Sequence, residues 1–279
     1  MISPEHSELI RARLSSGLRR LRVDAGMTGI VLAKAVGISQ PKLSKIETGM
    51  ALPGSAEVRA IAEVTGAPEA VLDELLSLLR ALHTDYESPR VMLHRGAHRR
   101  QQEINRMEEK ATRTHCLQIS MVPGQLQTER YMRTCFPSLS PDEVDAAVAA
   151  RKQRQRLLAR PDKQFTFLLT ESAVRWCRGP AATMAEQVRT LIDFTSSPTV
   201  RLGVLPWHRP VLAQPRHSFY VYDERLVTIS LQTAYTTIRD PEEVSDYLEL
   251  FNAVQDKCAF GAEARVVLGR VLRDLRGTP

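Results

Sequence analysis

The sequence predicts an all-α five-helix helix-turn-helix domain at the N-terminus, followed by an α+β domain. Over residues 8–82, apolar side chains recur at helical spacing in five short pieces, separated by glycine, proline or small polar residues. No strand pattern occurs in that range. Beyond residue 96, helical patterns alternate with short runs of β-branched and aromatic residues, which is typical of a mixed domain.

Length and composition fit two domains. The chain has 279 residues, of which 43% are hydrophobic and 25% are charged, so each half can form its own core. The stretch TDYESPRVMLHRG, residues 84–96, loses the helical periodicity and contains Pro89. We therefore predict a helix-turn-helix domain over residues 1–83, a linker over 84–95 and an α+β domain over 96–279.

Glycines and capping residues set the boundaries of the predicted helices. The first ends near Gly26, and the second begins after Thr28, a favourable N-cap residue. The fourth has Ser55 as its N-cap and ends at Gly66. The fifth, PEAVLDELLSLLRALH, carries apolar residues around most of its circumference, so it must be covered from two directions. The bundle covers one side, and either a dimer partner or the second domain covers the other.

The third helix lies in GISQPKLSKIETG, and Pro41 marks its first turn. With Ser39 as N-cap, Pro41 stands where the backbone N–H has no partner within the helix, so its absence is tolerated. Leu43 and Ile46 then face inward.

The second and third helices together carry the pattern of a helix-turn-helix. Such a unit needs a small residue where its helices touch, a glycine in the turn and apolar residues that lock the crossing angle. Ala33 and Gly37 meet the first two needs. The apolar positions are Leu32, Val36, Ile38, Leu43 and Ile46. A plain helical hairpin is the alternative, but binary patterning alone would seldom place both the alanine and the glycine.

The face of the third helix opposite Leu43 and Ile46 is polar and narrow enough for the major groove of DNA. We expect Lys45 to donate to guanine O6 and N7, Gln40 to pair with adenine, and the Pro41 ring to contact a thymine methyl group. Lys42, Arg19 and Arg20 are better placed for phosphates. The outward face and its flanks comprise Ser39, Gln40, Pro41, Lys42, Ser44, Lys45 and Thr48.

The charge distribution agrees with this interpretation. The chain has a net charge of +6, and residues 9–49 contain eight basic and two acidic residues, so this segment accounts for the whole excess. An anionic partner is therefore expected here. A solvated charged surface is the alternative for any single arginine.

The stretch LRRLRVDAGMTGIVLAKAVGISQPKLSKIETG resembles the Xre-type domains, which are Cro-like and phage-repressor-like, and the resemblance covers about residues 9–82. It implies a transcription regulator that binds double-stranded DNA as a homodimer. It also implies that Arg22 pairs with Glu47, and that the helix N-terminus at Thr28 and Gly29 holds a phosphate. The family commonly has glutamine at the position of Gly29. We therefore expect backbone N–H groups to hold the phosphate there, with weaker affinity.

In the second half, the clearest helix follows Ser140, which forms a capping box with Glu143 around Pro141. A further helix is capped by Asp240, and VPGQ predicts a type II turn with Gly124 at its third position. The other predicted helices are 96–111, 183–196 and 262–275, and the predicted strands are 115–121, 164–170, 199–206, 217–222 and 225–231.

The helix after Ser140 carries polar residues where burial is expected. Its apolar stripe passes through Arg151 and Gln155, and burying these side chains without partners would be unfavourable. They either meet a structural partner such as Glu171 or line a ligand or partner pocket. Trp207, in LPWHRP, is a further pocket candidate, although a packed tryptophan is the more ordinary expectation.

Several stretches of this half resemble the C-terminal domain of WhiJ-like regulators, an actinobacterial group with an Xre-type N-terminal domain. The stretches are MEEKATR, VPGQLQTERY, ARKQRQRLL, FLLTESAVRW, TMAEQV, VRLGVLPW and HSFYVYD. The resemblance implies a regulatory domain that is often encoded beside a small partner protein. Gln125 replaces the usual leucine of the turn, and RWCRG departs from the commoner form, so partner specificity does not carry over.

No pattern indicates an enzyme, a cofactor or a metal. His94 and His98 have the spacing of a metal pair but lack a recognisable third ligand. The four cysteines are widely spaced, which predicts buried, reduced thiols. Neither a signal peptide nor an apolar run long enough to span a membrane occurs, so we expect a cytoplasmic protein without membrane contact.

We therefore expect a sequence-specific DNA-binding regulator, a repressor rather than an activator, whose second domain senses a small partner protein or a ligand. One alternative is an antitoxin-like protein that sequesters a small partner encoded by a neighbouring gene and regulates its own operon. An enzyme with an appended DNA-binding domain is the other.

Overall fold

A computed structural model describes residues 4–87, 97–231 and 235–276 of the chain. The chain divides into two compact units. The first unit is Met1–Glu87 with Thr236–Val244, and the second is Ser88–Tyr235 with Ser245–Pro279. Each unit is described by itself below.

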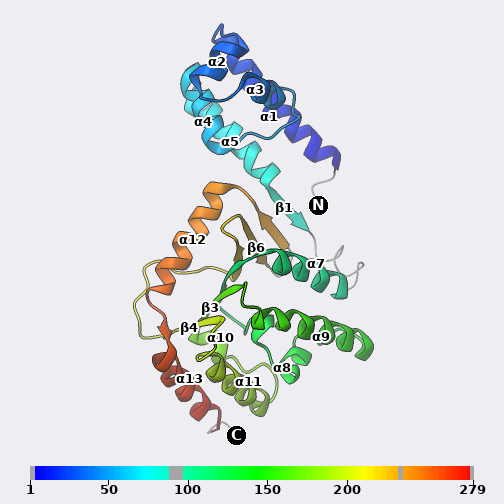
Figure 1. Cartoon of the computed structure of the whole chain (residues 1–279), viewed down its shortest axis with the longest axis vertical. Coiled ribbons are helices and arrows are strands. Elements are labelled where there is room, and N and C mark those ends of the chain that lie inside the picture. Colours follow the sequence, from blue (N-terminus) through cyan, green and yellow to red (C-terminus); the bar gives the residue numbers. More distant parts are fainter. Residues whose placement is uncertain (1–3, 88–96, 232–234, 277–279) are drawn as a thin grey trace. The chain divides into compact units, whose positions relative to one another are not determined.

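The first unit begins with five helices, as the fold class predicts (Figure 1). Thr28 and Ser39 are the predicted N-caps, and their hydroxyl groups accept from the N–H groups of Val31 and Lys42. The N-cap of α4 is Gly54 rather than Ser55, because the Glu57 carboxylate accepts from the Gly54 N–H at 2.9 Å. The bounds are Pro4–Asp24 for α1, Gly29–Ala35 for α2, Gln40–Glu47 for α3, Ser55–Thr65 for α4 and Glu69–His83 for α5.

A continuous apolar core holds these helices together. Between α2 and α3, Gly37 adopts a φ of +72°, a conformation that glycine adopts without the steric penalty of a Cβ. The buried core includes Leu14, Leu18, Leu32, Ala33, Leu43, Ile46, Val58, Ile61, Leu75, Leu76 and Leu79. The residues chosen from the sequence for the helix crossing therefore lie in or against this core.

The segment after α5 differs from the predicted linker. Residues Thr84–Glu87 form a strand, β1, beside β7 (Tyr235–Ile238). The sequence could not show this pairing, because β1 has no apolar alternation and its neighbouring strand lies about 150 residues further along the chain. The remainder of the predicted linker lies outside the described residues.

The second unit is an α+β domain. Its α-helices are α7 (Ala97–Lys110), α8 (Glu129–Thr134), α9 (Pro141–Gln155), α10 (Glu171–Arg175), α11 (Ala181–Phe194), α12 (Pro241–Gln255, from Ser245 onward in this unit) and α13 (Gly261–Arg276). Two 3₁₀ turns are η1 (Gly124–Leu126) and η2 (Arg156–Ala159). The strands are β2 (Arg113–Gln118), β3 (Gln164–Thr170), β4 (Val200–Leu205), β5 (Phe219–Tyr222), β6 (Leu226–Ser230) and β8 (Ala259–Phe260).

These strands lie in the order β6-β5-β2-β3-β4-β8. Strands β2, β3 and β4 are parallel, whereas β5, β6 and β8 run antiparallel to their neighbours. Side chains alternate between the two faces of a strand, so the register places His115, Thr166 and Arg201 in one row on one face.

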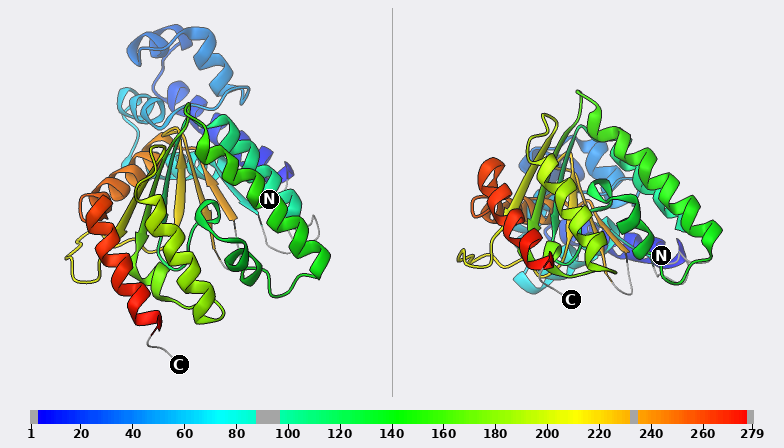
Figure 2. Two further views of the ribbon diagram at one scale, coloured as in Figure 1. Left: turned by 60° about the horizontal axis from the view of Figure 1, so that its bottom comes forward. Right: turned by 90° about the horizontal axis from the view of Figure 1, so that it is seen from below.

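The opposite face carries the main core of this unit. Cys116, Phe167 and Leu202 are buried there, together with apolar residues of α11 and α13. The views of Figure 2 show α11 and α13 running along the sheet. Helix α12 lies on the other face, where the ring of Phe251 contacts that of His115, with centroids 4.8 Å apart.

Two local expectations for this unit are wrong. VPGQ does not form a type II turn: Pro123 caps a 3₁₀ turn that begins at Gly124, and the φ of Gly124 is not positive. The side chain of Gln125 instead turns inward to polar partners, as described below. The cysteines are not all buried either, since Cys177 is exposed and Cys135 is half-buried.

Candidate nucleic-acid interface

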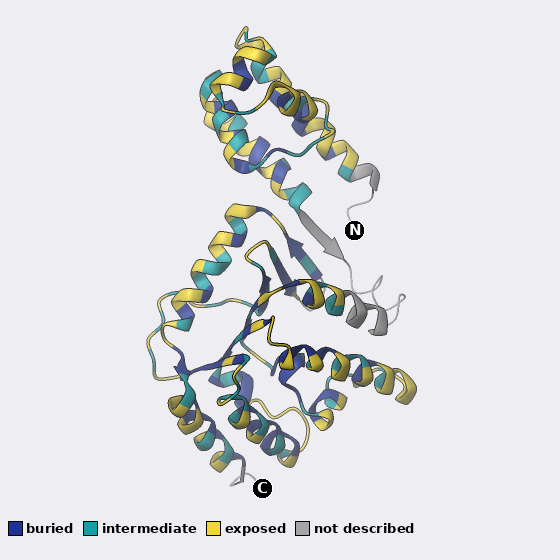
Figure 3. Cartoon of the chain, in the orientation of Figure 1, coloured by how far each residue is buried: buried dark blue, intermediate teal, exposed yellow. Residues whose placement is uncertain are grey.

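Helix α3 presents a polar face to solvent while its other face is fixed in the core. Leu43 and Ile46 are each 1% exposed. The predicted contact residues of α3 and its cap, namely Ser39, Gln40, Pro41, Lys42, Ser44, Lys45 and Thr48, are all exposed (Figure 3). The Thr48 hydroxyl donates to the Ser44 carbonyl at 2.8 Å, so its donor is already used.

An ion pair anchors the C-terminal end of α3. Arg22 Nε and Nη2 donate to the two Glu47 carboxylate oxygens, each at 2.7 Å, and Nη1 donates to the Met27 carbonyl at 3.0 Å. This hydrogen bonding raises the pKa of Arg22. A bidentate contact of this kind fixes orientation as well as distance, so it sets the position of the C-terminal end of α3 relative to α1.

Lys42 is already paired. Its ammonium group contacts the Glu57 carboxylate, which also caps α4 through Gly54. Burial raises the pKa of Glu57, but the hydrogen bonds from Lys42 and Gly54 outweigh it and hold the pKa below its usual value. The sequence assigned Lys42 to a phosphate, and the structure adds an acidic competitor that such a contact must displace.

The remaining predicted phosphate contacts surround α3. Arg19 and Arg20 are exposed on α1, and no ion pair joins either of them to another described residue. Thr28 is exposed and Gly29 is half-buried at the start of α2, with the Gly29 backbone near the Gln40 side chain. Basic side chains and a helix N-terminus therefore flank the polar face of α3.

The family comparisons match both units. A profile described as a helix-turn-helix domain covers residues 13–75. A second profile, described as a domain of unknown function, DUF5753, covers residues 101–270, which is more than half of the chain. The chain belongs to the DUF5753 family. The helix-turn-helix domain supports a DNA-binding regulator, while the DUF5753 domain carries no assigned activity.

Other comparisons add little. No curated protein matches the chain at a significant level. A structure of TrmBL2, an archaeal chromatin protein, aligns with 84% of this chain and 88% of its own at 14% identity and a TM-score of 0.34. Nuc, a phospholipase D family member from Salmonella typhimurium, aligns with 63% of this chain and 95% of its own at 12% identity and a TM-score of 0.33. Both TM-scores are too low to establish a shared fold.

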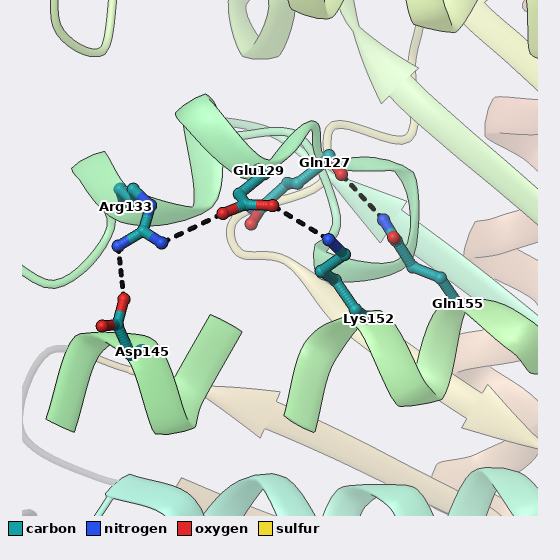
Figure 4. A network of polar contacts seen from close by, with 6 residues as sticks. All are labelled: Gln127, Glu129, Arg133, Asp145, Lys152 and Gln155. Atoms are coloured by element: carbon teal, nitrogen blue, oxygen red, sulfur yellow. Dashed lines mark hydrogen bonds and ion pairs between the residues drawn. The ribbon is translucent and has the colours of Figure 1, made fainter. Parts of the chain in front are cut away.

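In the DUF5753 domain, Arg151 and Gln155 meet partners other than the predicted Glu171. Arg151 donates to the Gln127 side chain and lies 4.5 Å from the centroid of the Phe136 ring. Gln155 donates to the backbone carbonyls of Gln125 and Gln127. Figure 4 shows the bond to Gln127. The loop after β2, rather than α10, supplies these acceptors, because it passes directly beside α9.

Glu171 and Trp207 form a separate cluster at the carboxyl ends of β3 and β4. Glu171 pairs with Arg175, four residues along the same short helix, at 2.6 Å, and it accepts from the Trp207 N–H at 3.0 Å. The Trp207 indole donates to Ser172 and remains 64% exposed, with the Arg175 guanidinium over its ring. The four predicted pocket residues therefore belong to two places, and Trp207 is not packed.

The sequence did not predict a buried ion pair in the DUF5753 domain, between Arg154 and Glu108. Arg154 donates to Glu108 through Nε at 3.0 Å, and the Glu108 side chain is fully buried. Gln125 donates to the same carboxylate at 2.6 Å and accepts from the Tyr220 hydroxyl at 3.2 Å, which explains the glutamine at this position. The available signal was that the inward side of α9 stays polar as far as Arg154. The partner could not be found, because Glu108 lies on a different helix, α7, 46 residues from Arg154 in the sequence.

The described residues contain no cluster of three or more histidine, cysteine or acidic side chains able to hold a metal ion. Of the predicted histidine pair, His94 and the side chain of His98 lie outside what the structure describes. No helix in the described ranges combines the length and the apolar character needed to cross a membrane.

Proposed function

We propose that the protein is a sequence-specific DNA-binding regulator in which α3 enters the major groove. The observation that carries this proposal is the division of α3 into two faces. Leu43 and Ile46 are held in the core, while the side chains of Gln40, Ser44 and Lys45 are exposed along the other face. A helix held in this way can offer donors and acceptors to base edges without rearranging the domain.

The proposal also assigns roles to individual residues and to the DUF5753 domain. We assign base contacts to Lys45 and Gln40, and phosphate contacts to Arg19, Arg20, the N-terminus of α2 and Lys42, which must leave Glu57 to make its contact. The protein acts as a homodimer on two half-sites. It represses transcription, because occupancy of a promoter is sufficient to exclude other proteins from it. The DUF5753 domain senses a small partner protein or a ligand, and the proposal gives the chain no catalytic activity.

The experiment begins with selection of a duplex from a random library by the full-length protein. Fluorescence anisotropy then compares the selected duplex with a scrambled duplex of equal composition. Lys45→Ala should weaken binding to the selected duplex by about 1–3 kcal/mol and affect the scrambled duplex far less. Lys42→Ala should weaken binding to both duplexes and flatten the salt dependence.

Lys110→Ala is the matched control, since Lys110 is an exposed lysine of α7 in the second unit. It should leave both affinities unchanged. The proposal is wrong if selection enriches no sequence, or if Lys45→Ala and Lys110→Ala behave alike on the selected duplex.

A further inference from the structure

A polar groove opens in the second unit between the sheet and α12. Its volume is about 830 Å³, which is within the range of small-molecule sites. The floor is the row His115, Thr166 and Arg201 on adjacent strands, and one wall is the part of α12 that carries Leu248, Asn252 and Gln255. A sheet face beneath a helix is ordinarily apolar, so this row is unusual.

Arg201 supplies the positive charge of the groove. Its guanidinium lies 4.6 Å from the centroid of the Phe260 ring, and no described carboxylate pairs with it. The Phe260 ring can pack against the backbone of β4 because Gly203 has no side chain. A Cβ at residue 203 would stand 2.7 Å from the ring. Arg201 is therefore positioned by an aromatic ring and keeps its donors available.

The other charges of the groove are balanced. Arg113 at the groove edge pairs with Glu224 at 2.9 Å, and Glu224 also lines the groove. The charge left over is that of Arg201, so the groove carries a net positive charge.

His115 supplies a ring nitrogen that lacks a partner within the described ranges, two strands away from Arg201 in the same row. Its Nδ1 is buried and has no hydrogen-bond partner among the described residues. Burial lowers the pKa of His115, so the ring is neutral near pH 7 and can carry its one proton on Nδ1. A buried ring nitrogen without a partner is unfavourable, and with its proton on Nδ1 the ring would gain a partner from an acceptor held above Thr166, between His115 and Arg201.

We propose that this groove binds a small organic oxyanion. Its carboxylate or phosphate group contacts Arg201, Thr166 and His115. Its apolar part packs against Leu248 and the Phe260 ring. This site deepens the sensing role proposed above by naming the class of ligand. Only the idea that the bound anion regulates DNA binding rests on that proposed function. The binding itself is measured without DNA.

The test uses full-length protein labelled with ¹³C in its histidine rings, with the His115 signal assigned from its absence in His115→Gln. The probes are phenyl phosphate and benzoate, and benzyl alcohol is the neutral control. At millimolar concentrations at least one anion should shift the His115 signal, while benzyl alcohol should not. Binding of only one anion identifies the oxyanion group that the groove prefers.

Arg201→Gln should raise the dissociation constant of the bound anion at least tenfold. Arg189→Gln, which changes an exposed arginine on α11 beyond the other face of the sheet, should leave it unchanged. Thermal unfolding checks that both variants are folded. The proposal fails if neither anion shifts the His115 signal, if benzyl alcohol shifts it equally, or if the two arginine variants bind alike. Because DNA is absent from these measurements, such a failure leaves the role of Lys45 untouched.

Discussion

Removal of Arg22 tests how the recognition helix is held. In Arg22→Ala, the Glu47 carboxylate would lose both of its 2.7 Å hydrogen bonds, although its side chain is only 9% exposed. Glu47 is also the last residue of α3, where the helix dipole disfavours negative charge. Removing one partner of a buried ion pair typically lowers the free energy of unfolding by about 3–5 kcal/mol. Because Arg22 is partly exposed, we expect the lower end of this range, about 3 kcal/mol.

The reverse change should cost less. In Glu47→Ala, the Arg22 guanidinium keeps its hydrogen bond to the Met27 carbonyl and some access to water, so we expect a loss of about 1–2 kcal/mol. The double variant should then show a coupling energy of about 1–2 kcal/mol.

Urea unfolding provides the assay, because two probes separate the two units. Both tryptophans, Trp176 and Trp207, lie in the second unit, so their fluorescence should be unchanged by either substitution. Far-UV circular dichroism also reports the helices of the first unit and should show an earlier transition. A loss below about 1 kcal/mol for Arg22→Ala, or strictly additive effects in the double variant, would refute the reasoning.

Three further substitutions have definite expected outcomes. Gly37→Ala places a Cβ at a φ of +72° with no neighbour within 4 Å, so it should lower the unfolding free energy of the first unit by about 1 kcal/mol, measured by urea titration. Glu57→Gln should free Lys42 and steepen the salt dependence of DNA binding, measured by anisotropy. The pKa of Glu57 is lowered in the folded state, so the Glu57 carboxylate stabilises the fold fully above its ordinary pKa of 4.5. This stabilisation is lost as the pH falls through the lower pKa of the folded state. Glu57→Gln should therefore lack this acid dependence in thermal unfolding. Gly203→Ala should lower the stability of the second unit by about 1–3 kcal/mol, followed by tryptophan fluorescence, because the new Cβ would stand 2.7 Å from the Phe260 ring and 2.9 Å from Leu168.

Local patterns predicted the helix-turn-helix unit well, because its determinants are close in sequence. Thr28 and Ser39 cap the helices that they precede, and Leu43 and Ile46 are spaced so that one helical face becomes buried. The capping box at Ser140 likewise starts α9, with the Ser140 N–H donating to Glu143 at 2.9 Å. Each of these features depends on residues within one or two helical turns.

Contacts between distant segments could not be predicted in this way. Glu108 lies 46 residues from Arg154, and Lys42 lies 15 residues from Glu57 on a different helix. The short strands β1, β7 and β8 were missed because pairing across the sheet stabilises them more than their own composition does. The groove at His115 needed the register of three strands, which only the folded chain supplies.

The central claim is that α3 reads the major groove, and methylation interference tests it most directly. Dimethyl sulfate methylates guanine N7 in the major groove and adenine N3 in the minor groove, so one reagent probes both. On the selected duplex, the account predicts that methylation at guanine N7 blocks binding, and that this interference fades in Lys45→Ala. Interference confined to adenine N3, or a guanine pattern that Lys45→Ala leaves unchanged, would contradict it.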